Sequence, residues 1–352
     1  MSIFANDIVS WYQNHKRDLP WRDTSDPYKI WLSEIILQQT RVEQGRAYYE
    51  KFVKKFPDVY ALANASQNEV LNLWQGLGYY SRARNLHQAA QQIVFEYGGR
   101  FPNTYNDIQK LKGVGPYTAA AIASFAFNRR VPVVDGNVFR FLSRYLKVKT
   151  PINSSKAFKE FFELADELMG EAPPADFNQA MMEVGALICK PNNPQCMFCP
   201  VQSRCEAYAA SEQLLYPVKN KKTKVQKRNL YYFVLEASNG LVLKLRDKKG
   251  IWQNMYEFPV IESEKPLKKN ELSEKAAEAG YISDEYTPLI QIGEERIHKL
   301  SHRELHARFY QVKTTVGRPG LVEFKALKNY PLPRLIDRFI EEEKPEYYLQ
   351  KE

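Results

Sequence analysis

Cysteine is scarce in this 352-residue chain and confined to one short stretch. All four cysteines lie between residues 189 and 205, in the spacing C-x6-C-x2-C-x5-C, so no thiols remain for a disulfide framework elsewhere. Four thiolates this close in sequence can hold a metal ion or an iron–sulfur cluster. Clustered cysteines bind metals more often than they pair in a reducing compartment, so we expect a cytoplasmic or nucleoid protein. The four residues are Cys189, Cys196, Cys199 and Cys205.

Long apolar runs are also missing. The longest, Ala119–Phe127, is interrupted by Ser124 and is too short to cross a bilayer. The first residues carry neither a basic segment nor a long apolar stretch, which argues against a signal peptide. These absences disfavour a membrane protein.

Acidic residues are outnumbered, 41 against 50 lysines and arginines, so the net charge is +9 and the pI is about 9.1. A basic chain favours an anionic partner, here nucleic acid. The length suggests two domains, and the hydrophobic content of 44% is enough for real cores. We expect a monomer.

Residues 1–215 are predicted to be helical, because apolar residues recur at intervals of three and four and β-branched alternation is scarce. Asp26 and Pro27 mark one helix start, an N-cap followed by a proline in the first turn. Residues 104–107 have the pattern of a capping box before another helix.

Residues 216–228 contain six basic residues and no acid. This composition predicts a solvated linker, and a segment that follows a phosphate backbone is the alternative; one segment can do both.

Residues 229–352 have a different character. A strand-like run covers 230–236, Asn239-Gly240 is a hairpin signal, and 241–245 is the expected return strand. A helix near 272–279 and a strand at 307–313 complete the pattern, which predicts an α+β domain.

The segment 111–118, Leu-Lys-Gly-Val-Gly-Pro-Tyr-Thr, joins two helical stretches, and Pro116 is placed to open the second. Two glycines allow a tight turn that exposes backbone N–H groups, which can hold a phosphate without reading sequence. An ordinary helix–helix turn has the same pattern. Asp135, in Val-Val-Asp-Gly-Asn-Val, is by itself equally typical of a cap or turn residue.

Taken together, the glycine hairpin, Asp135 in its context and the cysteine spacing resemble the endonuclease III superfamily of DNA glycosylases. The resemblance covers the first 215 residues. It implies an all-α helix-hairpin-helix glycosylase domain whose four thiolates hold a [4Fe–4S] cluster. Zinc is the weaker alternative, since zinc sites usually show two close pairs separated by a longer gap. The alternative to an enzyme is a non-catalytic iron–sulfur protein that binds DNA.

Within this superfamily, the bifunctional glycosylase/lyases carry a lysine nucleophile just after the hairpin, where this chain has Tyr117. A lysine amine can form a Schiff base with the sugar, and a phenol cannot. The resemblance therefore implies a monofunctional, hydrolytic enzyme, with a pyrimidine glycosylase/AP lyase as the alternative.

Three further segments, at 19–22, 31–40 and 76–82, narrow the resemblance to the MutY-type adenine DNA glycosylases. That family removes adenine mispaired with 8-oxoguanine or guanine in double-stranded DNA, and reaching the base implies that it is flipped out of the duplex.

Glu34 is expected to be partly desolvated, because its helical neighbours include Ile30, Trp31 and Leu37. Desolvation raises a carboxyl pKa and keeps a proton available near neutral pH. The alternative is a glutamate paired with Arg41 or another cation.

The resemblance assigns a role to each of several residues. Glu34 would protonate adenine at N7, and ionised Asp135 would stabilise the cationic sugar and orient water, directly or through a transient covalent adduct; the arrangement parallels the carboxylate pairs of glycosidases. Tyr117 and Asn137 would position these groups. The remaining assignments are Arg22, Trp31 and Gln179 in the adenine pocket; Gly113, Val114 and Gly115 at the DNA backbone; and Gln39, Thr40, Leu77, Tyr79, Ser301 and His302 at 8-oxoguanine. Leu77 and Tyr79 also fit ordinary core packing.

Residues 250–259 resemble the segment that leads into a Nudix box, and the second domain, residues 229–352, is expected to be a Nudix-like domain that recognises 8-oxoguanine. Aligned on Gly280, the Nudix box has Ser273 in place of its arginine and Ala277 in place of one glutamate. The domain is therefore expected to bind rather than to hydrolyse, which disfavours a Nudix-type nucleotide hydrolase.

Three histidines, His298, His302 and His306, are spaced by four, but the strand-like sequence that follows argues against a helical metal site. Residues 298–302 instead resemble the family's loop that senses 8-oxoguanine, with Leu300 where the family more often has phenylalanine. A hydroxyl and an imidazole can complement the N7–H donor and the O8 acceptor of that base.

Overall fold

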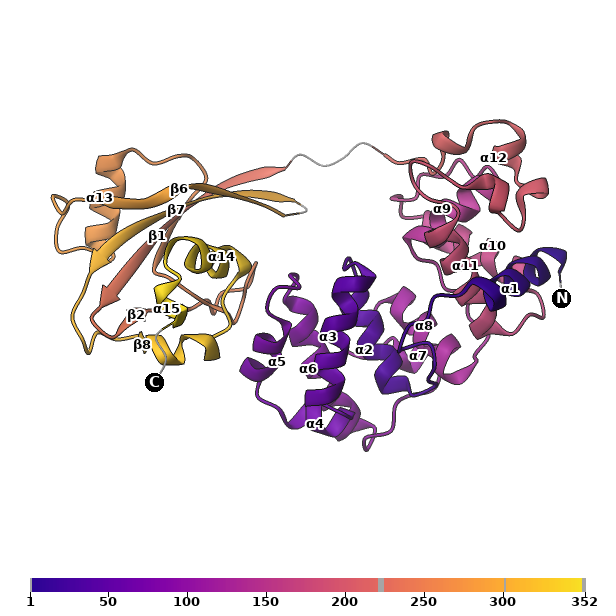
Figure 1. Cartoon of the computed structure of the whole chain (residues 1–352), viewed down its shortest axis with the longest axis horizontal. Coiled ribbons are helices and arrows are strands. Elements are labelled where there is room, and N and C mark those ends of the chain that lie inside the picture. The colour runs from indigo at the N-terminus through magenta and orange to yellow at the C-terminus, as the bar shows by residue number, and fades with distance from the viewer. Residues whose placement is uncertain (1, 221–224, 301, 350–352) are drawn as a thin grey trace. The chain divides into compact units, whose positions relative to one another are not determined.

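The structure is a computed structural model that describes residues 2–220, 225–300 and 302–349. It forms two compact units, one of Met1–Asn64 and Asn85–Lys221 and one of Ala65–Arg84 and Lys222–Glu352 (Figure 1). The division at 221/222 falls inside the predicted linker, but the grouping of 65–84 with the C-terminal unit has no counterpart in the predicted boundaries, which stay predictions. In the part of the chain described, no helix has the length and apolar character to cross a membrane.

The first unit is built from helices, as predicted. They are α1 (Ile3–His15), α2 (Pro27–Leu37), α3 (Val42–Lys55), α4 (Val59–Asn64), α7 (Tyr105–Ile108), α8 (Pro116–Phe127), α9 (Gly136–Tyr145), α10 (Ala157–Met169), α11 (Pro174–Leu187) and α12 (Glu206–Ala209), with single turns η1 (Cys196–Phe198), η2 (Gln202–Arg204) and η3 (Gln213–Leu215). Helix α6 (Ser81–Glu96) begins in the second unit and ends in the first.

The core of the first unit joins elements from distant parts of the sequence. Helices α1, α9, α10 and α11 bury one apolar cluster that includes Phe4, Phe141, Phe161 and Phe177. Helix α2 packs against α3 and α8. The predicted start of α2 is confirmed, because the Asp26 side chain accepts a hydrogen bond from the Tyr28 N–H.

The glycine hairpin joins α7 to α8, and Gly113 is required there. Its φ is +75°, and a Cβ atom at this position would lie 2.5 Å from the Cβ of Asn85. Gly115 forms the N-cap of α8, and Pro116 opens the helix as predicted. The N–H of Val114 is donated to Leu111 O. The hairpin thus has the local geometry that the sequence predicts.

The second unit is an α+β structure. Its strands are β1 (Gln226–Ala237), β2 (Gly240–Val242), β3 (Lys244–Leu245), β4 (Tyr256–Glu257), β5 (Val260–Ser263), β6 (Ile290–Lys299), β7 (Arg303–Lys313) and β8 (Leu321–Glu323), and its helical elements include α5 (Gln67–Trp74), α13 (Lys269–Glu278), η4 (Phe324–Asn329), α14 (Arg334–Glu343) and α15 (Glu346–Leu349). The main sheet has the order β6-β7-β1-β2-β8, with β5 also paired to β1. Among the described strands of this sheet, β1 and β7 pair in parallel and the other pairs are antiparallel.

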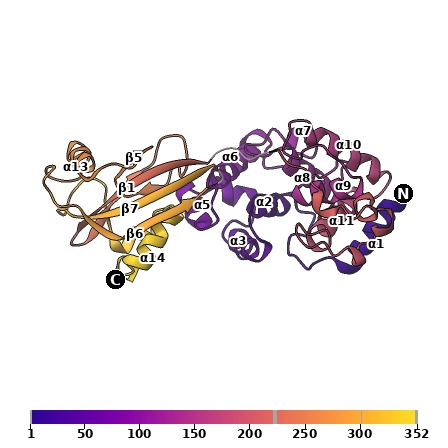
Figure 2. The ribbon, with the colours of Figure 1, turned by 90° about the horizontal axis from the view of Figure 1, so that it is seen from above.

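One predicted strand is shorter than expected. The return strand at 241–245 ends at Val242, because Leu243 donates its N–H to Gly320 O and the next two residues pair with β4 instead. Alternate residues of β1 cover the two faces of the sheet. Phe233 packs towards α13, whereas Tyr232 stacks on Phe309, which stacks on Phe339 of α14. Figure 2 shows α13 and α14 on opposite sides of the strands.

Candidate active site and cysteine centre

Residues of five helices, α2, α3, α8, α9 and α11, and of the segments next to them line a pocket in the first unit. It measures about 930 Å³, counting the space at its open mouth. Seven of the residues predicted for catalysis, adenine binding or lesion recognition line it: Arg22, Glu34, Thr40, Tyr117, Asp135, Asn137 and Gln179. The fold therefore gathers residues that are up to 157 positions apart in the sequence, from Arg22 to Gln179.

Glu34 lies on the face of α2 that points into the pocket, together with Ile30 and Leu37. The Tyr117 hydroxyl of α8 donates a hydrogen bond of 2.6 Å to Glu34 Oε2. Burial raises the pKa of Glu34 to about 7, while this hydrogen bond opposes the shift and the nearby Asp135 carboxylate adds to it. The prediction of a desolvated carboxyl is confirmed, and the alternative of a pair with Arg41 has no support among the ion pairs of the described residues.

Asp135 is the N-cap of α9, so a backbone requirement fixes its position. Its Oδ1 accepts from the Val138 N–H at 2.7 Å, and its Oδ2 accepts from Asn137 Nδ2 at 2.7 Å. Burial raises the pKa of Asp135, and these hydrogen bonds oppose the shift. Donors that point at the carboxylate, together with the partial positive charge of a helix N-terminus, favour its ionised form.

Glu34 and Asp135 have different environments, and the difference determines which of the two carboxyl groups carries a proton. Asp135 has two hydrogen-bond donors and a helix N-terminus, whereas Glu34 has one phenolic donor and apolar neighbours. Two nearby carboxylates disfavour simultaneous ionisation. The shared arrangement therefore favours a protonated Glu34 beside an ionised Asp135.

A buried carboxylate orients one wall of the pocket. Glu183 on α11 is fully buried and receives two-pronged hydrogen bonds from Arg17 and Arg22, with side-chain distances of 2.6 to 2.9 Å. Burial alone would raise the pKa of Glu183, but the two guanidinium groups hold it at about 2. Arg22 is thus fixed in place by Glu183. Neither Arg17 nor Glu183 was predicted from the sequence, although Glu183 follows Gln179 by one helical turn.

Gln179 projects from the same helix and has its own partner. The Tyr12 hydroxyl donates to Gln179 Oε1 at 2.6 Å, and the Arg22 guanidinium lies 5.6 Å from the centre of the Tyr12 ring. Tyr12 thereby holds both predicted adenine-pocket residues, Arg22 and Gln179. No local motif identifies it, because its contacts span most of the first unit.

The structure places Trp31 elsewhere. It is fully buried, does not line the pocket, and packs against Tyr28 and Phe101. The pocket face of α2 carries residues 30, 33, 34 and 37, and Trp31 is turned from that face towards the core. The tryptophan that lines the pocket is Trp21. The structure thus places Trp31 in the core and not in the pocket that is predicted to take adenine.

A chain of contacts links the pocket to the cysteine segment. Arg140 on α9 donates to Asn137 Oδ1 at 2.9 Å, to Gly185 O at 2.6 Å and to Cys189 O at 2.7 Å. Asn137 in turn holds Asp135. Arg140 therefore holds the backbone at Cys189 directly and, through Asn137, the side chain of Asp135.

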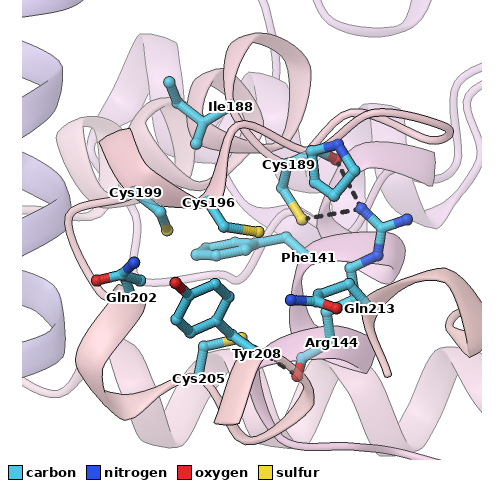
Figure 3. Close-up of a pocket in the computed structure, with 11 residues that line it drawn as sticks. Phe141, Arg144, Ile188, Cys189, Cys196, Cys199, Gln202, Cys205, Tyr208 and Gln213 are labelled. Atoms are coloured by element: carbon cyan, nitrogen blue, oxygen red, sulfur yellow. Dashed lines mark hydrogen bonds between the residues drawn. The ribbon is translucent and has the colours of Figure 1, made fainter. Parts of the chain in front are cut away.

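The four cysteines lie around a second, smaller space in the first unit. Figure 3 shows their side chains surrounding it, with Phe141 and Tyr208 among the other lining residues. The space measures about 350 Å³, part of it open to solvent. All four thiols are free of disulfide bonds.

Arg144 organises the backbone around these thiols. Its buried guanidinium donates to Lys190 O at 2.7 Å, Pro191 O at 2.8 Å and Tyr216 O at 3.2 Å. It also approaches Cys189 Sγ at 3.4 Å. One arginine therefore ties the backbone that follows Cys189 to Tyr216.

The four thiols fit an iron–sulfur cluster in number and kind. They surround one shared space, and four cysteine thiolates are the usual protein ligands of such clusters. In the residues that can be described, no group of three or more His, Cys, Asp or Glu side chains could hold one metal ion as the side chains now lie. The residues present are therefore compatible with a cluster, and zinc stays the alternative.

The residues predicted for 8-oxoguanine recognition fall in both units. Gln39 is exposed on a left-handed backbone with φ +58°, and Thr40 lines the pocket of the first unit. Leu77, Tyr79 and His302 belong to the second unit, where Tyr79 is 50% exposed and Leu77 only 9%. Ser301 lies outside the described residues. The alternative of core packing thus suits Leu77 better than Tyr79.

The degenerate Nudix box lies on α13, where Ser273 is buried. The three histidines are not on a helix. His298 lies on β6 and His306 on β7, in an antiparallel pair where they face Leu305 and Ile297 respectively. His306 is hydrogen-bonded to Glu295 and Glu304. The expectation against a helical histidine site is confirmed.

Comparisons with known proteins agree with this geometry. Residues 32–166 match the HhH-GPD superfamily of base excision DNA repair proteins, and residues 231–342 match the NUDIX domain family. A solved thermostable thymine-DNA glycosylase is 32% identical with a TM-score of 0.55, over 59% of this chain and 96% of that one. An endonuclease III trapped on DNA, 19% identical with a TM-score of 0.52, covers 59% of this chain and 94% of its own, and shows the shared fold of the helical unit.

Curated relatives extend the match to most of the chain. The adenine DNA glycosylase of Buchnera aphidicola subsp. Baizongia pistaciae is 36% identical over 310 residues, which cover 86% of this chain and 84% of that protein. The adenine DNA glycosylase of Mus musculus is 45% identical over 217 residues, 59% of this chain and 42% of its own. The chain belongs to the adenine DNA glycosylase family of base excision repair enzymes.

Proposed function

We propose that this enzyme removes adenine from double-stranded DNA where adenine is paired with 8-oxoguanine or with guanine, and that it hydrolyses the N-glycosidic bond without cutting the strand. The observation that carries the proposal is one pocket in which a buried Glu34 with a pKa of about 7 lies beside an Asp135 held by two hydrogen-bond donors. The names of the relatives support adenine as the base.

Glu34 is the general acid of this proposal. Cleavage of the N-glycosidic bond builds negative charge on the departing base, and a proton delivered to adenine N7 neutralises it. A general acid works best when its pKa lies near the operating pH. A carboxyl with a pKa of about 7 is half protonated at neutral pH, whereas an ordinary glutamate is almost entirely ionised there.

Asp135 acts on the sugar. The departing base leaves positive charge on the sugar ring, and an ionised carboxylate stabilises that charge and orients the attacking water. Asn137 holds Oδ2, and the α9 backbone holds Oδ1, so the carboxylate needs no reorganisation when the charge appears. Tyr117 keeps Glu34 in position by the hydrogen bond to its Oε2.

The adenine base must leave the duplex to enter the pocket. Gln179 can recognise it because an amide offers two N–H donors, and its oxygen retains a second lone pair after accepting from Tyr12. Trp21 supplies an apolar wall and Arg22 a fixed donor. No lysine occurs among the described residues that line the pocket, which counts against a Schiff-base lyase.

The hairpin glycines Gly113 and Gly115 are suited to hold a phosphate of the flipped strand through backbone N–H groups, and Val114 between them donates its N–H to Leu111. On the opposite strand, Gln39, Thr40, Leu77, Tyr79, Ser301 and His302 are proposed to contact the 8-oxoguanine and the space around it.

The four cysteines are proposed to hold a [4Fe–4S] cluster. When bound, the cluster supplies four iron–thiolate bonds that cross-link residues 189–205. Arg144 and Arg140 then tie that segment to the rest of the first unit, and Arg140 connects it to Asn137. Bond cleavage itself is assigned to Glu34 and Asp135.

Single-turnover base release tests the proposal. Duplexes with adenine opposite 8-oxoguanine, guanine or thymine, and a duplex with thymine glycol, are each incubated with excess enzyme. Adenine release should be fastest opposite 8-oxoguanine, slower opposite guanine and absent opposite thymine. Release of thymine glycol, or a covalent complex trapped by borohydride, would instead support a pyrimidine glycosylase/lyase. Glu34→Gln and Asp135→Asn should bind the 8-oxoguanine duplex and fail to release adenine; near-normal release by either would remove that residue from its role.

A further inference from the structure

We propose that residues 251–254, the coupling loop, connect the β6–β7 hairpin to residues 75–80, the wedge loop, and so set how strongly the enzyme prefers 8-oxoguanine over guanine opposite adenine. The inference rests on the function proposed above, because it takes the hairpin and the wedge loop to contact the DNA strand opposite the adenine. It assigns positioning roles to Trp252 and Asn254. All these residues belong to the second unit.

The coupling loop has a defined and strained shape. Trp252 and Asn254 both adopt left-handed backbone conformations, with φ of +58° and +60°. Asparagine tolerates this conformation, but a tryptophan keeps it only where surrounding contacts fix it. Arg246 supplies such contacts, since its Nε donates to Ile251 O at 3.0 Å and its carbonyl accepts from the Asn254 N–H at 2.7 Å.

Arg246 is itself anchored in the body of the unit. Its guanidinium pairs with Glu257 at 2.7 Å and with Glu262. Glu257 is buried and also accepts from the Tyr232 hydroxyl at 3.2 Å. The coupling loop is therefore held from the sheet side by a paired, largely buried arginine, and it does not move freely.

One side of the coupling loop contacts the β6–β7 hairpin. The Trp252 side chain is 7% exposed, and its ring centre lies 5.8 Å from that of His298 on β6. His298 faces Leu305 across the hairpin, and His302, exposed, lies beyond the end of β6. A movement of the hairpin end is therefore transmitted to the Trp252 ring through a packed aromatic contact.

The other side contacts the two helices that flank the wedge loop. Asn254 Nδ2 donates to Gln67 Oε1 on α5 at 2.7 Å. Arg84 Nη1 on α6 donates to Gln253 O at 2.6 Å. Helix α5 leads into the wedge loop and α6 follows it, so these two hydrogen bonds hold the helices on both sides of the loop, one at the first residue of α5 and one in the first turn of α6.

The wedge loop is rigid enough to pass such a displacement to its tip. Gly76, Gly78 and Tyr79 have φ values of +96°, +74° and +49°. Trp74 Nε1 and Arg82 Nη2 both donate to Gly78 O, at 3.1 and 3.2 Å. These contacts hold the backbone next to the half-exposed Tyr79, and in this proposal a shift of α5 or α6 changes the position of the Tyr79 ring.

The β6–β7 hairpin and the helices beside the wedge loop, more than 200 residues apart in the sequence, thus both contact the four-residue coupling loop. The coupling is reciprocal, because any state of the hairpin that favours one position of Trp252 also favours one position of the wedge loop. This gives a route by which recognition of the opposite base affects how firmly Tyr79 supports the emptied duplex.

The variant Asn254→Gly tests the connection in the intact protein. It removes the amide that binds Gln67 while glycine still permits the left-handed backbone. Single-turnover adenine release from the 8-oxoguanine duplex should slow about five-fold, the factor expected for loss of one neutral hydrogen bond, whereas release from the guanine duplex should be unchanged. The preference for 8-oxoguanine therefore falls about five-fold. Gln311→Ala, which removes an amide hydrogen bond to Glu236 in the same unit, should leave the preference unchanged.

Testing Asn254→Gly in a protein that also carries Tyr79→Asn separates a positioning role of Asn254 from a general loss of structure. Tyr79→Asn removes the ring and suits a left-handed backbone. If Asn254 acts through the wedge loop, Asn254→Gly should have no further effect on the preference in the Tyr79→Asn protein. The inference is overturned if both duplexes slow equally, if the preference is unchanged, or if the two substitutions act independently. Failure of the wild-type enzyme to release adenine from either duplex would instead refute the proposed function.

Discussion

Replacement of Glu34 by glutamine should abolish adenine release and at the same time stabilise the folded enzyme at alkaline pH. Glutamine keeps the size and one hydrogen-bonding oxygen of the side chain but carries no charge. In the wild type, burial raises the pKa of Glu34 from 4.5 to about 7. Between pH 4.5 and about pH 7, Glu34 is therefore mostly protonated in the folded protein and mostly ionised in the unfolded chain.

The sign and size of the effect follow from this difference. Because the folded-state pKa is raised, the stability that the protonated carboxyl retains is fully present below pH 4.5 and is lost as the pH rises through about 7. A tenfold change in a proton-binding constant corresponds to about 1.4 kcal/mol, so ionised Glu34 lowers the free energy of unfolding by about 3 kcal/mol at pH 8 and by less than about 1 kcal/mol at pH 5. The free energy of unfolding of the Glu34→Gln variant should exceed that of the wild type by these amounts.

Urea unfolding of both proteins at pH 5 and pH 8, followed by tryptophan fluorescence, measures the gain. A matched control has the opposite sign. Glu183 has its pKa lowered to about 2 by Arg17 and Arg22, so Glu183→Gln should destabilise the enzyme at both pH values. The reasoning is refuted if Glu34→Gln is no more stable than the wild type at pH 8, or if its gain is the same at pH 5.

Three further outcomes are expected. Tyr117→Phe removes a hydrogen bond that lowers the pKa of Glu34, so the alkaline limb of the pH–rate profile for adenine release should move up by about one to two pH units. Gly113→Ala should cost at least about 1–2 kcal/mol in chemical unfolding, because φ is +75° and the new Cβ meets Asn85, and it should weaken binding to undamaged duplex in a filter assay. Arg144→Met should leave several buried carbonyls unpaired at about 1–3 kcal/mol each, seen as a lower thermal unfolding midpoint and loss of the visible absorbance of an iron–sulfur cluster; an unchanged spectrum would contradict this.

Local patterns predicted the parts of the fold that local chemistry decides. The cap at Asp26, the hairpin at Gly113 and the end of α13 before Gly280 each depend on a few adjacent residues, and each lies where the sequence places it. The cysteine spacing likewise indicated a shared site, because its members are close in sequence. The roles of Glu34 and Asp135 needed the family resemblance, since nothing local relates two residues a hundred positions apart.

The misplaced tryptophan shows where helical periodicity stops being informative. Helical spacing puts Trp31 near Glu34, but a spacing of three permits either side of a wide face, and the packing of Phe101 decides which. The pairing of Arg17 with Glu183 across 166 positions was equally beyond reach, because it is a tertiary contact. The contacts of 65–84 with the C-terminal unit, such as Asn254 with Gln67, were missed for the same reason.

The use of Asp135 as a helix cap has a stereochemical consequence. One of its oxygens is committed to the Val138 N–H, so the carboxylate cannot rotate to exchange its two oxygens without uncapping α9. Its other oxygen, Oδ2, accepts from a side chain, that of Asn137, and is the oxygen that in the proposed function faces the sugar. If the proposed function holds, a sugar in the pocket meets negative charge from one fixed direction, and the face of the ring that is shielded is set by the backbone of a helix rather than by a mobile side chain.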